Sequence, residues 1–352
     1  MVPAIGYSAA RGAEQAARSR RPRDAMPDPS ITQHNVDRLV TVFGGSGFLG
    51  RHIIRLLCKR GYRIRVAVRR PDLAGHLQPL GRVGQVHAVQ ANLRYPASVE
   101  AAVAGADVVV NLVGILFERG RQRFETVQAE GPGLVARAST AAGARLIHVS
   151  ALGASPDAPA LYARTKAAGE QGVQAEAPGA VIFRPSIVFG PEDDFFNKFA
   201  AMARLAPMLP LVGGGHTRFQ PVFVGDVAAA VATAADGAAQ SGTIYELGGP
   251  DVRTFRQLME FVLATAERKR LLVPIPFAAA RLLGSILQFM PTPLLTPDQV
   301  RMLEVDNVVS ADAARERRTF EGLGIEPRAM TAIVPSYLWR FRKSGQFRSR
   351  PA

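Results

Sequence analysis

Three polar residues in the middle of the chain have the types and the spacing of an acid–base site. Ser150 ends an apolar, strand-like run, and Tyr162 and Lys166 follow it in a helical segment, four residues apart. Side chains with that spacing share one face of a helix. An ammonium group beside a phenol lowers the pKa of the phenol, so Tyr162 is a candidate general acid or base. Ser150 is then a candidate to polarise a substrate carbonyl.

A glycine-rich turn near residue 45 predicts a dinucleotide site. Residues 39–43 form a short apolar, β-branched run, residues 44–50 read Gly-Gly-Ser-Gly-Phe-Leu-Gly, and a helical pattern follows. Gly44 permits the tight turn, Gly47 lets backbone N–H groups approach a pyrophosphate, and Gly50 lets the helix pack on the strand. The expected contacts to the dinucleotide in this turn are Gly44, Ser46, Gly47, Phe48, Leu49 and Gly50.

The residues after the second expected strand indicate which dinucleotide is bound. Residues 64–68 form that strand, and Arg69 and Arg70 follow it. An NAD-binding protein usually carries an acidic residue there, which hydrogen-bonds the ribose 2′-hydroxyl. The carboxylate of such a residue would repel the 2′-phosphate of NADP(H). A guanidinium instead holds a phosphate through two hydrogen bonds. The pair therefore predicts NADP(H), and the alternative is that both arginines are simply solvated.

Strands and helices alternate regularly through the first half of the chain. Gly114 closes one of the apolar runs, at a point where the backbone passes close to the cofactor. The alternation predicts an α/β fold with a doubly wound parallel Rossmann sheet and a smaller C-terminal α/β lobe. Further strands are expected at 85–89, 107–114, 145–150 and 180–183, with a helix over 124–142. The expected parts are a disordered basic tail (1–35), an NADP-binding Rossmann domain (36–250) and a lobe (251–352) that also receives part of 190–222.

The composition excludes several classes of protein. The chain of 352 residues can bury a sizeable core, and its formal net charge of +14 attracts anionic partners. No basic module interleaved with aromatic residues accompanies that charge, so we do not expect nucleic acid as a partner. The single cysteine, Cys58, excludes an internal disulfide framework. No apolar run reaches the roughly 18 residues of a transmembrane helix. We expect no metal site, because the acids at 192–194 are explained by the dipole of the helix that follows.

The glycine turn and the set Ser150, Tyr162 and Lys166 resemble the extended short-chain dehydrogenases/reductases. In that family the tyrosine and lysine also hydrogen-bond the nicotinamide ribose, so a protein that only binds cofactor can keep both. Relatives often carry an asparagine in the preceding helix, whereas residues 125–128 read Glu-Thr-Val-Gln, which counts against proton relay. The resemblance adds four expected cofactor contacts: Asn92 and Leu93, in place of an adenine-contacting Asp-Leu pair, and Arg184 and Pro185, in the R-P-x-x-x-x-G turn.

Residues 192–200 and 220–228, together with the glycine turn, resemble one branch of that group, the nucleotide-binding accessory subunits of respiratory complex I. The resemblance implies tightly held NADPH without turnover and contacts with subunits of the peripheral arm. It also implies a peripheral place at the membrane, on the cytoplasmic face of the inner membrane in a bacterium or on the matrix side in a mitochondrion. The match runs from about Val40 to Pro327, and its most specific residues are Phe189, Gly190, Glu192, Asp193, Phe199 and Ala200.

An apolar segment over residues 271–295 is broken by four prolines. Its helical core, between Pro276 and Pro291, is too short to span a bilayer. The segment can lie in a membrane interface, with nearby basic residues facing phospholipid headgroups. The alternative is a buried helix pair of the lobe. The basic residues concerned are Arg268, Lys269, Arg270 and Arg281.

Two functions remain open at this point. The first is an NADP(H)-binding accessory or assembly subunit of respiratory complex I, in which the cofactor is structural and is not turned over. The second is a catalytically active NADP-dependent reductase or epimerase that uses Tyr162 and Lys166 on an isoprenoid, quinone or nucleotide-sugar substrate.

Overall fold

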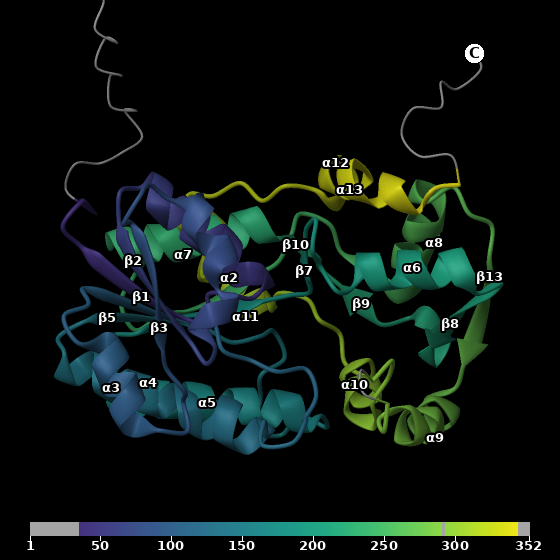
Figure 1. Ribbon diagram of the computed structural model, residues 1–352. Coiled ribbons are helices and arrows are strands. Elements are labelled where there is room, and N and C mark those ends of the chain that lie inside the picture. Colours follow the sequence, from purple (N-terminus) through teal and green to yellow (C-terminus); the bar gives the residue numbers. More distant parts are fainter. Residues whose placement is uncertain (1–34, 291–292, 344–352) are drawn as a thin grey trace, which may run out of the picture.

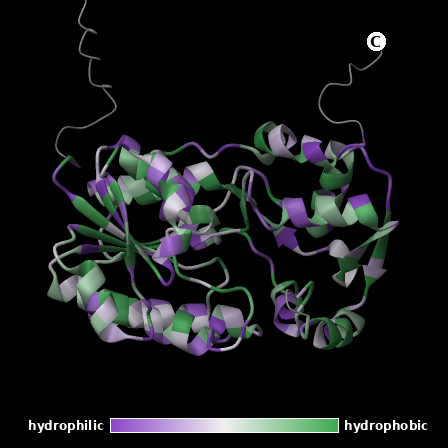
Figure 2. Ribbon diagram, in the orientation of Figure 1, coloured by the Kyte–Doolittle hydropathy of each residue, from purple (hydrophilic) through white to green (hydrophobic). Residues whose placement is uncertain are grey.

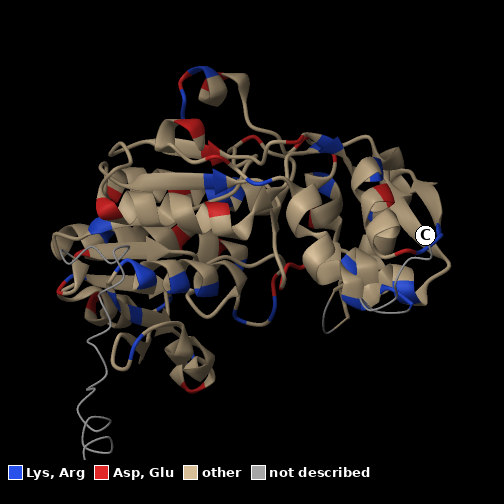
Figure 3. Ribbon diagram, turned by 90° about the horizontal axis from the view of Figure 1, so that it is seen from above, with Lys and Arg blue, Asp and Glu red and all other residues tan. Residues whose placement is uncertain are grey.

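The computed structural model describes residues 35–290 and 293–343, so the expected basic tail lies outside the described residues except for Asn35. Two parts lie side by side: a sheet covered by helices on both faces, and a smaller lobe built mainly from the second half of the chain (Figure 1). In the view of Figure 3, Lys and Arg positions and Asp and Glu positions occur along the ribbon of both parts.

A seven-stranded sheet forms the centre of the larger part, and all of its strand pairs are parallel. The strand order is β11-β6-β5-β4-β1-β2-β3, so the direction of winding reverses between β1 and β4. This confirms the predicted doubly wound Rossmann sheet, in which ligands bind beyond the carboxyl ends of the strands at the reversal. The strands are β1 (Leu39–Phe43), β2 (Arg63–Val68), β3 (Val86–Gln90), β4 (Val108–Asn111), β5 (Arg145–Val149), β6 (Val181–Pro185) and β11 (Ile244–Leu247).

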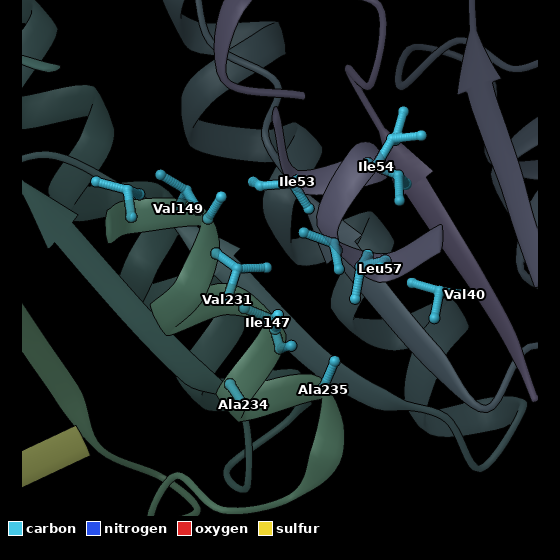
Figure 4. Packing of buried hydrophobic residues seen from close by; sticks show 14 of the residues in the cluster. Val40, Ile53, Ile54, Leu57, Ile147, Val149, Val231, Ala234 and Ala235 are labelled. Atoms are coloured by element: carbon cyan, nitrogen blue, oxygen red, sulfur yellow. The ribbon is translucent and has the colours of Figure 1, made fainter. Parts of the chain in front are cut away.

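Helices cover both faces of the sheet (Figure 1). Apolar residues recur along α2 with helical spacing, and Ile53, Ile54 and Leu57 are fully buried against the strands and α7 (Figure 4). The expected helix over 124–142 begins with a π-helical turn, η4 (Glu125–Glu130). One face carries α2 (Phe48–Lys59) and α7 (Val224–Asp236), and the other carries α3 (Pro96–Val103), α4 (Gly131–Ala141) and α5 (Leu161–Glu176). The short helices η2 (Pro71–Leu73) and η3 (Gly75–Leu80) connect β2 to β3.

The lobe has its own hydrophobic core, which is rich in aromatic rings. Phe196 and Phe255 are buried there, and Phe195 packs its ring against both. Its helices are α6 (Phe196–Leu205), α8 (Phe255–Thr265), α9 (Phe277–Leu287), α10 (Pro297–Met302), α12 (Met330–Ile333), α13 (Pro335–Leu338), η5 (Gly213–Gly215) and η7 (Trp339–Phe341). Its short strand pairs are β8 (Met208–Val212) with β13 (Leu271–Ile275) and β9 (Arg218–Phe219) with β12 (Arg253–Thr254), and β7 (Val188–Phe189) pairs with β10 (Val222–Phe223) where the two parts join.

Part of the expected lobe belongs instead to the Rossmann domain. The segment with α11 (Ala311–Arg315) and η6 (Glu321–Leu323) returns to the sheet, and Phe320 and Leu323 join its core. The backbone N–H of Glu246 donates to the carbonyl of Arg318 at 2.9 Å, and the Arg318 guanidinium donates to the carbonyl of Ile244, also at 2.9 Å. The segment thereby covers β11, the edge strand, whose backbone polar groups need partners. The lobe does not therefore run uninterrupted from residue 251.

Candidate functional site

A cavity of about 950 Å³ opens between the carboxyl edge of the sheet and the lobe. Its size lies near the upper end of the range of small-molecule sites, about 300–1,000 Å³. Every residue expected at the site lines this cavity except Arg70 and Arg184. The lining residues from that set are Gly44, Ser46, Gly47, Phe48, Leu49, Gly50, Arg69, Asn92, Leu93, Gly114, Ser150, Tyr162, Lys166 and Pro185.

The glycine turn leaves room for a phosphate at the start of α2. Gly44 has a φ of +74°, which an L side chain rarely adopts, and a Cβ on Gly50 would lie 2.4 Å from the carbonyl oxygen of Gly45. Gly47 differs from both, because the nearest atom to a Cβ there is the Gly44 oxygen at 3.4 Å, an ordinary contact. The protein itself therefore does not require glycine at position 47. A pyrophosphate on the helix N-terminus would require it, and the open space at Gly47 fits the predicted cradle.

The two arginines after β2 have different surroundings. Arg69 is exposed and lines the cavity. Arg70 makes a two-pronged ion pair with Asp72, with nitrogen–oxygen distances of 2.7–3.2 Å, and does not line the cavity. The prediction of a phosphate ligand therefore rests on Arg69. Arg94, which the sequence reasoning did not select, also lines this end of the cavity, and its Nε donates to Oδ1 of Asn92 at 3.4 Å.

Ser150, Tyr162 and Lys166 all line the cavity. The Lys166 ammonium donates to the carbonyl of Val149 at 3.3 Å, which holds it beside the end of β5. Burial lowers the pKa of Lys166 to about 8 and raises the pKa of Tyr162 to about 12. The sequence analysis expected the ammonium to lower the pKa of the phenol. That expectation is wrong, because desolvation of the phenolate dominates at Tyr162.

The Ser150 hydroxyl is a buried polar group without a hydrogen-bond partner among the described residues. Such a group costs free energy unless a ligand or water satisfies it. Because Ser150 lines the cavity, its hydroxyl is available to a carbonyl or hydroxyl of a bound molecule. The residues present therefore fit a ligand whose polar group reaches this wall.

Gln128 has a role that the sequence reasoning missed. Its Oε1 accepts the N–H of Ile115 at 2.8 Å, and its Nε2 donates to Oγ1 of Thr165 at 3.3 Å. A Cβ on Gly114 would lie 3.5 Å from this Oε1 and 3.3 Å from Nζ of Lys166, so the amide lies close to the lysine. In place of the asparagine that relatives often carry in this helix, a glutamine on the π-helical turn connects the loop after β4 to α5.

His148 is a second buried group that the sequence reasoning did not select. It is 1 % exposed on β5, and its Nδ1 lies 3.3 Å from Nδ2 of Asn111 on the neighbouring strand. Burial, helped by the positive charge of Lys166, lowers the pKa of His148 to about 3. The imidazole is therefore neutral at physiological pH, and it adds no second positive charge beside Lys166.

Arg184 was expected to contact the cofactor, but it forms part of a buried ion-pair network. It donates to both carboxylate oxygens of Glu170, with a shortest distance of 2.6 Å, and lies 3.8 Å from Glu246. Glu170 is 3 % exposed, and a carboxylate that is so buried needs a partner of opposite charge. Arg184 supplies that charge, and only its neighbour Pro185 lines the cavity.

The acids at 192–194 lie just before α6, and the middle one is hydrogen-bonded within the protein. Asp193 is buried and accepts hydrogen bonds from the N–H of Gly190, the N–H of Asn197 and the hydroxyl of Tyr337. Over residues 35–290 and 293–343 there is no group of three or more His, Cys, Asp or Glu side chains that could hold a metal ion. In the same ranges no helix has the length and apolarity needed to cross a membrane.

The fold and the glycine-turn cavity define a dinucleotide-binding protein of the extended short-chain dehydrogenase type. A family model described as "NAD dependent epimerase/dehydratase family" matches residues 40–248, and the chain belongs to that family. A solved triphenylmethane reductase from Citrobacter sp. has the same fold, with a TM-score of 0.68 and 18% identity over 85% of this chain and 99% of the other.

Curated relatives narrow the comparison within that family. The chain is 37% identical over 321 residues to the mitochondrial "NADH dehydrogenase [ubiquinone] 1 alpha subcomplex subunit 9" of Arabidopsis thaliana, and the match covers 87% of this chain and 79% of that protein. A "Ceramide reductase" of Caulobacter vibrioides is 36% identical over 191 residues, which are 54% of this chain and 59% of that protein. The first match extends into the lobe, whereas the second covers a smaller share of both chains.

Proposed function

We propose that this protein is an NADP(H)-binding accessory or assembly subunit of a respiratory complex I, in which the dinucleotide stabilises the fold and is not turned over. The observation that carries this proposal is the 87% coverage of the chain by its similarity to subunit 9 of the alpha subcomplex. The Rossmann sheet is common to many functions, and site and partner surfaces distinguish them. Similarity that includes the lobe therefore counts for more than similarity confined to the sheet.

The parts of NADP(H) would occupy separate regions of the cavity. The turn at Gly47 and the N-terminus of α2 would hold the pyrophosphate, and Arg69 would hold the 2′-phosphate. Tyr162 and Lys166 would hydrogen-bond the nicotinamide ribose. The bound nicotinamide would supply hydride-transfer chemistry. Burial raises the pKa of Tyr162 to about 12, above the range that suits a general acid or base at neutral pH.

The arginine pair provides a matched test of cofactor choice. Arg69→Asp should weaken NADPH binding by about tenfold, or about 1.4 kcal/mol, because it places a carboxylate beside the 2′-phosphate. NADH binding should change less. Arg70→Asp is the control, since Arg70 pairs with Asp72 and does not line the cavity. Titration calorimetry of both variants with both cofactors tests the assignment, and a wild-type preference for NADH would refute it.

Assembly is tested on membranes of the source organism. We propose a peripheral place there, on the face that carries the peripheral arm of complex I, with subunits of that arm as partners. Protein carrying an affinity tag is purified in mild detergent and analysed by native mass spectrometry, which reports partners and cofactor together. Co-purification of complex I subunits with one NADP(H) per chain would support the proposal. Isolation without any respiratory subunit would refute the assembly role.

An active reductase is the second candidate function, and two observations favour it. The Ser150 hydroxyl is unpartnered at the cavity wall, and a relative that is 36% identical over part of the chain is named a ceramide reductase. In this case NADPH should be oxidised in the presence of an aldehyde, quinone or keto-lipid, and Tyr162→Phe should abolish the reaction. Negligible oxidation of NADPH across such a panel would exclude the reductase, and the structural role would stand.

A further inference from the structure

The lobe half of the cavity is apolar, and the dinucleotide site does not account for it. Away from the glycine turn, the cavity is lined by aliphatic and aromatic side chains of the lobe that include Phe199, Met202, Val212, Leu283, Leu287 and Leu303. The charged residues that line this half are Asp194 and Lys198, and the Lys198 ammonium donates to the carbonyl of Leu294 at 2.7 Å. No arginine of the described residues lines it. A nucleotide diphosphate would therefore find no guanidinium there, and the lining suits hydrocarbon.

Helix α9 forms one wall of this half, and it is apolar on two faces. Ala280, Leu283 and Leu287 line the cavity, with the spacing of one helical face. Leu282 and Ile286 point away from it and are 68% and 64% exposed. A surface helix is normally polar on its outer face. Figure 2 shows α9 as largely hydrophobic at the outer end of the lobe.

The exposed face of α9 does not fit a buried helix pair, which was one of the two alternatives for residues 271–295. A buried helix pair would hide the outer leucine and isoleucine, whereas here only Ala280 and Gly284 of α9 are buried. The basic residues near the segment do not act as a group. Arg268 and Arg270 donate to the lobe carbonyls of Phe341 and Ala203, and Arg281 pairs with Glu304.

We propose that the lobe half of the cavity binds one long hydrocarbon chain, acyl or isoprenoid, of an amphiphilic molecule. The polar group of that molecule lies toward Ser150, whose buried hydroxyl lacks a partner among the described residues, and its chain runs under α9. A chain that enters past α9 meets apolar side chains on both sides of the helix, so little of it is exposed to water on the way in. Burial of each methylene contributes about 0.8 kcal/mol, which favours a long chain over a short one. The proposal goes beyond the proposed function, because it requires neither assembly nor turnover.

Leu282 and Leu283 give a matched pair of variants for the test. They are neighbours on α9 and both are partly exposed, but only Leu283 lines the cavity. The full chain is titrated with a fatty acid that carries a terminal dansyl group, whose fluorescence rises in an apolar site. Leu283→Asp should weaken probe binding by about tenfold or more, whereas Leu282→Asp should change it by about twofold or less. Leu287→Asp is a second variant on the cavity face.

Competition experiments identify the type of hydrocarbon chain that binds, and they separate this proposal from the proposed function. Displacement of the probe by hexadecanol or by farnesol supports the proposal and distinguishes a saturated from an isoprenoid chain. NADPH binding should persist in Leu283→Asp, which shows that the variant is folded. Equal loss in the Leu282 and Leu283 variants would place the probe on the surface, and displacement by UDP-glucose alone would indicate a polar ligand; either result overturns the proposal. Probe binding in a protein that fails to bind NADPH would sustain this inference while the proposed function fails.

Discussion

Substitution of Gly47 separates the needs of the ligand from the needs of the fold. Gly47 precedes α2 with φ −78° and ψ −179°, an extended conformation that valine adopts readily. A Cβ there meets only the Gly44 oxygen, at 3.4 Å. Gly47→Val should therefore cost the free protein no more than about 1 kcal/mol, since valine is a poorer helix N-cap than glycine. Its branched side chain should nevertheless fill the space that a pyrophosphate needs.

The loss of NADPH binding in Gly47→Val can be measured as a loss of the stabilisation that NADPH gives to the folded protein. NADPH at a hundred times its Kd should stabilise the wild type by about 2.7 kcal/mol. With an unfolding entropy of about 2.1 cal/mol/K per residue, a chain of 352 residues gains roughly 1.4 °C per kcal/mol, so the midpoint of thermal unfolding should rise by about 4 °C. Gly47→Val should show no such rise. Gly75→Val is the matched control, because no atom lies within 4 Å of a Cβ at Gly75 and this glycine does not line the cavity, so it should keep the full shift.

A third variant serves as a control for substitutions that damage the fold. Gly50→Ala would place its Cβ 2.4 Å from the Gly45 carbonyl, so it should lower the unfolding midpoint with or without NADPH. If Gly47→Val lowers the ligand-free midpoint as strongly as Gly50→Ala does, glycine at position 47 serves the fold and the argument from space fails. If Gly47→Val keeps the full NADPH shift, the dinucleotide binds elsewhere.

Three further predictions concern the wall around the tyrosine. Tyr162→Phe should leave NADPH affinity within about tenfold by calorimetry, because it removes one hydrogen bond worth about 1 kcal/mol; loss of binding would contradict this. The pKa of His148 is about 3 in the folded protein, so at mildly acidic pH this imidazole is protonated in the unfolded chain but not in the folded one. The free energy of unfolding therefore falls as the pH drops from about 6.5 toward 3. Near pH 4.5 this loss should reach about 3 kcal/mol, and denaturant titrations should show a smaller loss in His148→Gln but not in the exposed control His87→Gln. The Asp298 carboxylate caps the N-terminus of α5, because it accepts hydrogen bonds from the N–H groups of Leu161 and Tyr162 at 2.7 and 2.9 Å. Asp298→Ala should therefore destabilise the protein by about 0.5–2 kcal/mol. An unchanged midpoint of thermal unfolding would show that this cap does not contribute to stability.

The features that the sequence predicted are local in the chain. The β-branched run before Gly44, the turn and the helix after it lie within about twenty residues, and their periodicity and glycine spacing are sufficient to place them. The same holds for Tyr162 and Lys166, which one helix brings together. Parallel pairing of the strands then follows from the alternation of strand and helix, because each crossover returns the chain in the same direction.

The features that the sequence analysis missed depend on distant partners. Arg184 faces Glu170 and Glu246, and nothing near it in the chain indicates that pairing. Gln128 approaches Thr165 because α5 lies unusually close: a Cβ on Gly169 would be 2.1 Å from the Gln128 carbonyl. A glycine that permits close approach of two helices has no signature in a single sequence. The pKa of Tyr162 likewise depends on burial by the whole site, which spacing alone does not reveal.

Asp298 links the lobe to the helix that carries the tyrosine. Helix α5 receives no side-chain cap from its own N-cap residue, Ala160, and the lobe supplies the missing acceptor from α10. Helix α10 also packs against α9, where a Cβ on Gly284 would lie 3.0 Å from the backbone of Pro297. A molecule bound under α9 therefore contacts a unit whose other end fixes the first turn of α5. The two hydrogen bonds of Asp298 thus join the lobe to the first turn of the helix that carries Tyr162.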